Sequence, residues 1–209
     1  MRSTPLFLRF VLLLGLIASP AAADQVCGEL LPIGLLEPAG GFTLGCSRQF
    51  TLKLGAALGP DGNYILLDMP ACPDGPCAGL SGGAQLQCAA ASGYACCIQT
   101  GLHIPTLTGG NVGALAAGLS QRFALDTDPS PGICYASYAG NGARVALASL
   151  AQFPGSIRTE MIITSFARVF LVAPPTGSGQ ATTFTVEFLA QGPTPTSVRS
   201  WGRIKRLYR

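Results

Sequence analysis

Apolar and β-branched residues gather in three runs in the last third of the chain. The runs cover positions 143–150, 160–173 and 181–190. Such residues favour strands, and the turn-forming sequence APPTGSGQ separates the last two runs in the manner of a hairpin connection. The pattern predicts that this part of the chain forms an antiparallel sheet.

The third run shows the clearest alternation of apolar and polar side chains. Its sequence TFTVEFL has a period of two, which is typical of a strand with one buried face. The predicted inward set is Phe184, Val186 and Phe188, and the predicted outward set is Thr183, Thr185 and Glu187.

Turn chemistry divides the N-terminal half of the chain. The turn sequence GPDGN at 59–63 precedes the short apolar run 64–69, which a proline ends, so this run is predicted to be a strand. Residues 42–55 alternate well enough to predict extended structure. Residues 24–41 are rich in proline, glycine and leucine without a sustained period, and predict an irregular lead-in tied down through Cys27.

Two segments have helical character. Small residues dominate 82–95, and a second helix is predicted to begin after Asn111 as its cap. One face of this second helix carries Val112, Leu115, Leu119 and Phe123. The predicted fold class is α+β, with an antiparallel sheet, open or barrel-like, two short helices and a disulfide-stapled N-terminal half.

The chain divides into three parts. Residues 1–23 have the form of a secretory signal peptide, with a basic start, about nine apolar residues and small residues before a cut after Ala23. Retention of this segment as an anchor is the alternative, although a span needs roughly 20 apolar residues. Residues 24–191 are predicted to form a single disulfide-containing α+β domain, and 192–209 a proline-spaced linker and basic tail. We therefore expect an exported protein, periplasmic or associated with the cell surface.

Export determines how the cysteines are interpreted. All of them follow the signal segment and precede residue 135, and their even number in an oxidising compartment predicts up to four disulfides. The eight are Cys27, Cys46, Cys72, Cys77, Cys88, Cys96, Cys97 and Cys134. Connectivity stays open at this point, because Cys72 and Cys77 could close a short loop or each could reach Cys88 or the Cys96–Cys97 pair. The adjacent pair is not expected to bond to itself.

Charge is distributed unevenly. Between the signal and the tail there are six basic against ten acidic residues, a balance of −4, which disfavours nucleic-acid binding by the domain. The tail, where apolar residues are interspersed with cations, is a candidate for membrane-surface contact; the alternative is a disordered, solvated segment. The residues for that contact are Arg199, Trp201, Arg203, Lys205, Arg206 and Arg209.

Catalytic and metal-binding motifs are sparse. The single histidine, His103, could be combined with Ser120 or Ser137 and Asp126, but the sequence has no Gly-x-Ser-x-Gly nucleophile turn. The cysteine spacings favour disulfides over zinc, and the acidic residues near the 59–63 turn do not follow a calcium-loop signature. We therefore predict no catalytic, cofactor-binding or metal-binding residues and no enzymatic activity.

Three stretches carry a resemblance to a known family. They are GPDGNYILLDM (59–69), ASGYACCIQTGLHIPTLTGGNVGALAAGLSQRF (91–123) and TSFARVFLVAPPTGSGQATTFTVEFLA (164–190). In their order they resemble the extracytoplasmic region of TadG-like proteins of the Tad/Flp pilus-assembly family. The resemblance implies a non-enzymatic accessory or structural role with pilus-assembly proteins as partners. It also implies that Asn63 and Asp68 set strand-end geometry and that Arg122 positions the second helix.

Two other functions remain as hypotheses from the sequence. One is a secreted hydrolase that uses His103. The other is an envelope binding module that docks through its basic tail.

Overall fold

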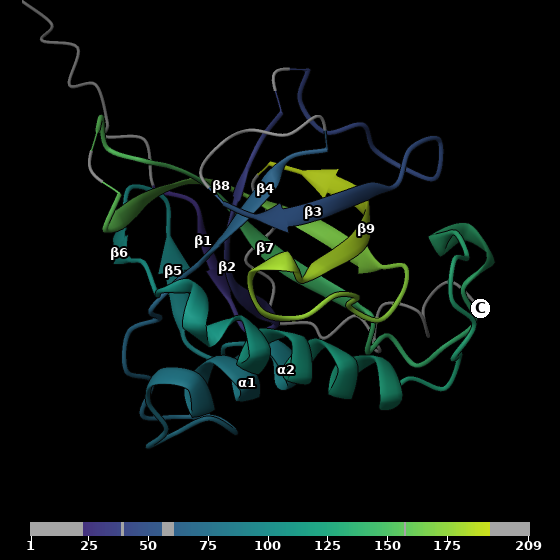
Figure 1. Ribbon diagram of the computed structural model, residues 1–209, viewed down its shortest axis with the longest axis horizontal. Coiled ribbons are helices and arrows are strands. Elements are labelled where there is room, and N and C mark those ends of the chain that lie inside the picture. Colours follow the sequence, from purple (N-terminus) through teal and green to yellow (C-terminus); the bar gives the residue numbers. More distant parts are fainter. Residues whose placement is uncertain (1–22, 39, 56–60, 157, 193–209) are drawn as a thin grey trace, which may run out of the picture.

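The computed structural model describes residues 23–38, 40–55, 61–156 and 158–192 (Figure 1). The predicted signal peptide, apart from its last residue, and the basic tail lie outside these ranges. The strands are β1 (Gln25–Cys27), β2 (Leu30–Leu36), β3 (Phe50–Leu54), β4 (Asn63–Leu66), β5 (Cys97–Gln99), β6 (His103–Pro105), β7 (Val145–Gln152), β8 (Glu160–Leu171) and β9 (Thr183–Gln191). The α-helices are α1 (Gly82–Ser92) and α2 (Val112–Ala124), and single 3-10 turns lie at Gly109–Asn111, Tyr135–Ser137 and Gly179–Ala181.

The main sheet closes on itself. Its seven strands run in the order β6-β8-β7-β2-β4-β3-β9, and β9 also pairs with β8. The long strand β8 makes this closure, because its first residues pair with β6 and its last residues with β9. Most pairings are antiparallel, whereas β2 with β7 and β3 with β4 are parallel. The predicted α+β class with its largely antiparallel, closed sheet is confirmed.

Strand β2 occupies the segment that the sequence predicted to be irregular, so that prediction was wrong. All seven of its residues are buried, and it lies between β4 and β7 in the sheet. A strand covered on both faces has a continuous apolar sequence instead of an alternating one. Pro32 is accommodated where the register with β7 shifts, between Leu30 and Gly34. Gly34 leaves space for Met161, whose Sδ would lie 2.9 Å from a Cβ at this position.

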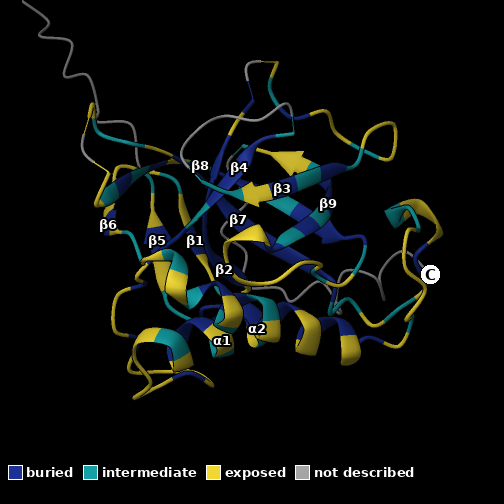
Figure 2. Cartoon of the chain, viewed as in Figure 1, coloured by how far each residue is buried: buried dark blue, intermediate teal, exposed yellow. Residues whose placement is uncertain are grey.

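Two apolar cores lie on opposite faces of β2 and its neighbouring strands. One core has Leu31, Ile33 and Leu35 on β2 and includes buried residues of both helices. The other core includes Leu30 and Leu36 of β2, together with buried residues of β1, β5 and β6. It also contains Cys72 and Cys77. Figure 2 shows the central strands largely buried and the outer faces of both helices exposed.

The two helices lie side by side along one end of the ring (Figure 1). The predicted buried face of α2 is confirmed, since all four of its residues are at most 7% exposed. Asn111 stands at the cap position but its side chain makes no capping hydrogen bond. Close approach of the helices requires Gly118, because a Cβ there would lie 2.3 Å from the carbonyl oxygen of Gln87 on α1.

Four disulfides link cysteines in the N-terminal two thirds of the chain. They are Cys27–Cys97, Cys46–Cys134, Cys72–Cys96 and Cys77–Cys88. The prediction of four bridges is confirmed, and the open choice for Cys72 and Cys77 is settled against a bond between them. Adjacent Cys96 and Cys97 form disulfides with different partners, Cys72 and Cys27. They therefore join the paired strands β1 and β5 to the loop after β4.

Two further details differ from the sequence-based predictions. Glu187 is only 3% exposed, although the alternation placed it outward. It does lie on the outer face of β9, but the loop that follows α2 covers that face, and the backbone N–H of Tyr135 in this loop donates to Glu187 Oε2 at 2.9 Å. The segment predicted to be extended over 42–55 forms a regular strand only at β3.

Candidate functional site

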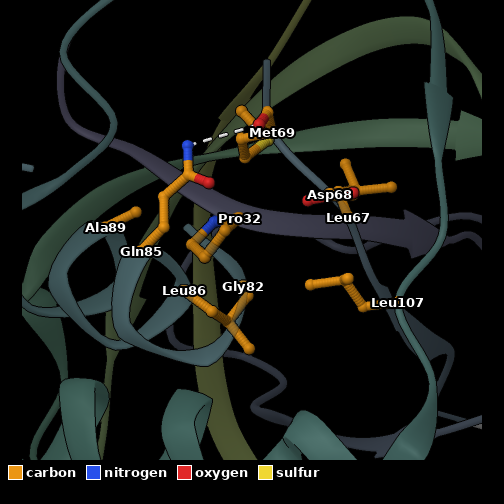
Figure 3. A pocket seen from close by; sticks show the side chains of 9 residues that line it. All are labelled: Pro32, Leu67, Asp68, Met69, Gly82, Gln85, Leu86, Ala89 and Leu107. Carbon is orange, nitrogen blue, oxygen red and sulfur yellow. Dashed lines mark hydrogen bonds between the residues drawn. The ribbon is translucent and has the colours of Figure 1, made fainter. Parts of the chain in front are cut away.

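A small pocket lies between the start of α1 and the chain that leaves β4 (Figure 3). Its volume is about 170 Å³, including the part open to solvent. Its lining comprises Pro32, Leu67, Asp68, Met69, Gly82, Gln85, Leu86, Ala89 and Leu107. Most of the residues in this lining are apolar, and Asp68 and Gln85 are its polar members.

Gln85 fixes one wall of this pocket. Its side chain is 8% exposed, and Nε2 donates hydrogen bonds of 3.3 Å to the carbonyl oxygens of Met69 and Pro70. Figure 3 shows the Gln85 amide reaching from α1 to Met69. Tyr94 OH donates a second bond to the Pro70 oxygen at 2.9 Å. The chain leaving β4 is thereby held against α1 by buried polar groups.

Residues 70–81, which we call the cystine loop, connect two members of the pocket lining, Met69 and Gly82. Cys72–Cys96 and Cys77–Cys88 attach this loop to α1 and to the segment that follows α1. Both Cys72 and Cys77 are buried, whereas Leu80 at the end of the loop is 42% exposed. The loop therefore presents a covalently restrained surface beside the pocket.

The residues considered for catalysis are not brought together. His103 Nδ1 lies 3.2 Å from Glu160 Oε1, in an exposed contact between β6 and β8. Asp126 instead accepts hydrogen bonds from Tyr138 OH and from the backbone N–H groups of Asp128 and Arg144. Asp126 therefore organises a loop, and no Ser-His-Asp arrangement forms among the described residues.

The acidic residues near the 59–63 turn contact different groups. Asp61 pairs with Arg48 Nη2 at 3.0 Å, while Asp68 lines the pocket. A different group was not predicted from the sequence: Cys46 Sγ, Cys134 Sγ and a Glu187 oxygen lie within 4.8 Å of one another. Only the fold could reveal it, because the three residues come from two loops and β9.

Arg144 organises the loop between α2 and β7, and the sequence did not single it out. This side chain is fully buried. Nε donates to Leu171 O at 2.8 Å, Nη2 to Val172 O at 2.8 Å, and Nη1 to the oxygens of Asp128 and Ser130. Its guanidinium lies 4.3 Å and 4.4 Å from the ring centroids of Phe123 and Phe170.

Electrostatics in this loop follow from burial and hydrogen bonding. Burial raises the pKa of Tyr138, and its hydrogen bond to Asp126 raises that pKa further. Backbone N–H donors from Ala139 and Ser130 lower the pKa of Asp128. Both groups keep their ordinary charge at neutral pH, as expected of residues that hold a loop in place.

Arg122 links three elements. Nε donates to Ala90 O on α1 at 2.8 Å, and Nη1 donates to Ala143 O and Val145 O at the start of β7. Burial lowers the pKa of Arg122 to about 10, and the charge of Glu29 opposes this shift. These contacts fix α2 relative to α1 and the sheet.

No protein-family model, curated protein or solved structure matches this chain. The fold and the site therefore define its class by themselves: a disulfide-stapled α+β protein suited to an oxidising, extracytoplasmic environment. In the described ranges, neither helix is long and apolar enough to cross a lipid bilayer.

Proposed function

We propose that this protein is an exported, non-enzymatic accessory or structural protein of Tad/Flp-type pilus assembly and surface adhesion, which acts by binding pilus-assembly proteins. The observation that carries the binding role is the cystine loop beside the pocket. Two disulfides restrain this loop, so that a partner meets a surface whose conformational entropy has already been reduced.

The pilus-assembly setting rests on the resemblance of the three sequence stretches to TadG-like proteins. Two of these stretches contribute directly to the pocket region, since 59–69 ends in the lining residues Leu67, Asp68 and Met69. Residues 91–123 supply Cys96 and Leu107. Export to the periplasm or cell surface is consistent with the disulfides and completes the proposal.

Two exposed leucines allow a matched test. Leu80 ends the cystine loop, whereas Leu125 follows the last turn of α2 and is 61% exposed. A photo-crosslinking amino acid would replace each leucine in turn in the full chain. After irradiation of intact cells, the crosslinked proteins would be identified by mass spectrometry.

We expect pilus-assembly components to be captured from position 80 and not from position 125. Capture of the same proteins from both positions, or of none from position 80, would contradict a role for the cystine loop. Deletion of the gene provides a second readout of function. Unchanged surface fibres and unchanged adhesion after deletion would contradict the pilus setting even if a partner were captured.

A further inference from the structure

Glu187 is a buried carboxylate in an unusual position. It is 3% exposed on the outer face of β9, and the hydrogen bond from Tyr135 N to its Oε2 is 2.9 Å long. Arg48 pairs with Asp61 and His103 contacts Glu160, and neither of these contacts involves Glu187.

Two sulfur atoms also lie close to this carboxylate. Cys46 Sγ, Cys134 Sγ and a Glu187 oxygen all lie within 4.8 Å of one another. Cys46 and Cys134 are linked as a disulfide that joins residues 40–49 to the loop between α2 and β7. Cys46 is exposed and Cys134 is partly exposed, so solvent and reagents reach this bond.

We propose that Cys46, Cys134 and Glu187 form a binding site for a borderline-soft divalent cation, Zn²⁺ in the first instance, when the Cys46–Cys134 disulfide is reduced. Zn²⁺ takes thiolate and carboxylate ligands in tetrahedral geometry, with a Zn–S distance of about 2.3 Å and a Zn–O distance of about 2.1 Å. Ligand atoms on such a tetrahedron are separated by less than the 4.8 Å limit of this cluster. Two thiolates and one carboxylate leave the fourth position for a water molecule.

Conversion of the Cys46–Cys134 disulfide into a metal site requires a two-electron reductant, and a dithiol supplies these electrons. The dithiol reduces the Sγ–Sγ bond in a two-electron step, which yields the Cys46 and Cys134 thiols and leaves the dithiol as a disulfide. Each thiol then releases its proton to solvent as its sulfur binds the cation. The two loops stay joined in both states, first through the disulfide and then through the metal.

The first test uses the wild-type full chain treated with a dithiol without oxygen. Thiols are alkylated at increasing Zn²⁺ concentrations, and mass mapping identifies which cysteines the metal protects. We expect Zn²⁺ to protect Cys46 and Cys134. The isosteric variant Glu187→Gln should raise the Zn²⁺ concentration for half-protection at least about ten-fold, the loss that even outer-shell changes produce. Absence of protection at these two cysteines, or equal protection in the variant, would overturn the proposal.

A second variant separates metal binding from reduction. Cys46→His combined with Cys134→His cannot form this disulfide and leaves the other three disulfides oxidised. Calorimetric titration with Zn²⁺ should show one bound ion per chain, and addition of Glu187→Gln should weaken its binding at least about ten-fold. A folded double variant, judged by circular dichroism, that binds no Zn²⁺ would show that the three positions do not converge on a metal.

Discussion

The Nε of Arg144 donates a hydrogen bond of 2.8 Å to the carbonyl oxygen of Leu171, the last residue of β8. The same guanidinium also bonds to Asp128 and Ser130, so one buried side chain joins the sheet to the loop after α2. Arg144→Met would retain the length of the side chain but leave these carbonyl groups without their donor. We expect the free energy of unfolding to fall by about 3–5 kcal/mol.

Urea denaturation of both proteins measures this change. Arg158→Met is the matched control, because Arg158 is exposed and its guanidinium stacks on the Phe153 ring at 4.4 Å. The control should change the free energy of unfolding by less than about 1 kcal/mol. Equal effects of the two substitutions would refute the organising role of Arg144.

Two glycines of α2 give opposite predictions for the same substitution. Gly118→Ala would place a Cβ 2.3 Å from Gln87 O and 2.6 Å from Ala90 Cβ, so the helices must move apart. We expect a loss of about 1–3 kcal/mol in the free energy of unfolding. Gly113→Ala meets nothing within 4 Å and should stabilise the protein by up to about 1 kcal/mol through helix propensity. Thermal unfolding of both variants would reveal the sign of each effect.

The disulfides should differ in their contribution to stability according to the chain that they enclose. Cys46–Cys134 spans 88 residues and Cys77–Cys88 spans 11. Loop-closure entropy predicts losses of about 4.5 and about 3 kcal/mol when each pair is replaced by alanine. Urea unfolding of the two double variants, with the remaining disulfides verified by mass spectrometry, measures the order. A larger loss for the 11-residue bridge would contradict this entropic explanation.

The raised pKa of Tyr64 predicts that the protein loses stability at high pH. Burial raises its pKa from 10.0 to about 12, and its hydroxyl donates to Thr182 O at 3.0 Å. Between these pH values the unfolded chain loses the phenol proton while the folded chain retains it, so the free energy of unfolding falls with pH. The share of Tyr64 in this slope should be about 1.4 kcal/mol per pH unit.

The variant Tyr64→Phe isolates this share. It should lose about 1 kcal/mol at neutral pH, because Thr182 O loses its donor, and its stability should then fall less steeply above pH 10.0. Burial also raises the pKa of Tyr94 and Tyr138, so part of the slope should remain. Identical slopes in the variant and the wild type would show that Tyr64 ionises normally.

Local sequence patterns predicted the elements whose neighbours are close along the chain. The three C-terminal strands follow from runs of apolar and β-branched residues, and the buried face of α2 follows from periodicity. Strand β2 could not be recognised in this way. It contains Pro32 and Gly34, and only its distant neighbours β4 and β7 explain why it is extended.

The candidate site was less predictable than the fold. The pocket combines residues from β2, the end of β4, α1 and the segment near Leu107, and no local pattern brings these together. The same holds for Glu187. Its period-two position correctly assigns it to the face of β9 opposite Phe188, but burial on that face depends on a loop some 50 residues earlier, which contains Tyr135.

The bridge between Cys46 and Cys134 has a mechanical consequence. If the chain were pulled from its two ends, the force would pass through this covalent bond, and the 88-residue separation would not be extended. At about 3.5 Å per residue, the disulfide prevents roughly 300 Å of extension. Under tension the protein would lengthen only through the segments outside this bridge, which include β2, β7, β8 and β9.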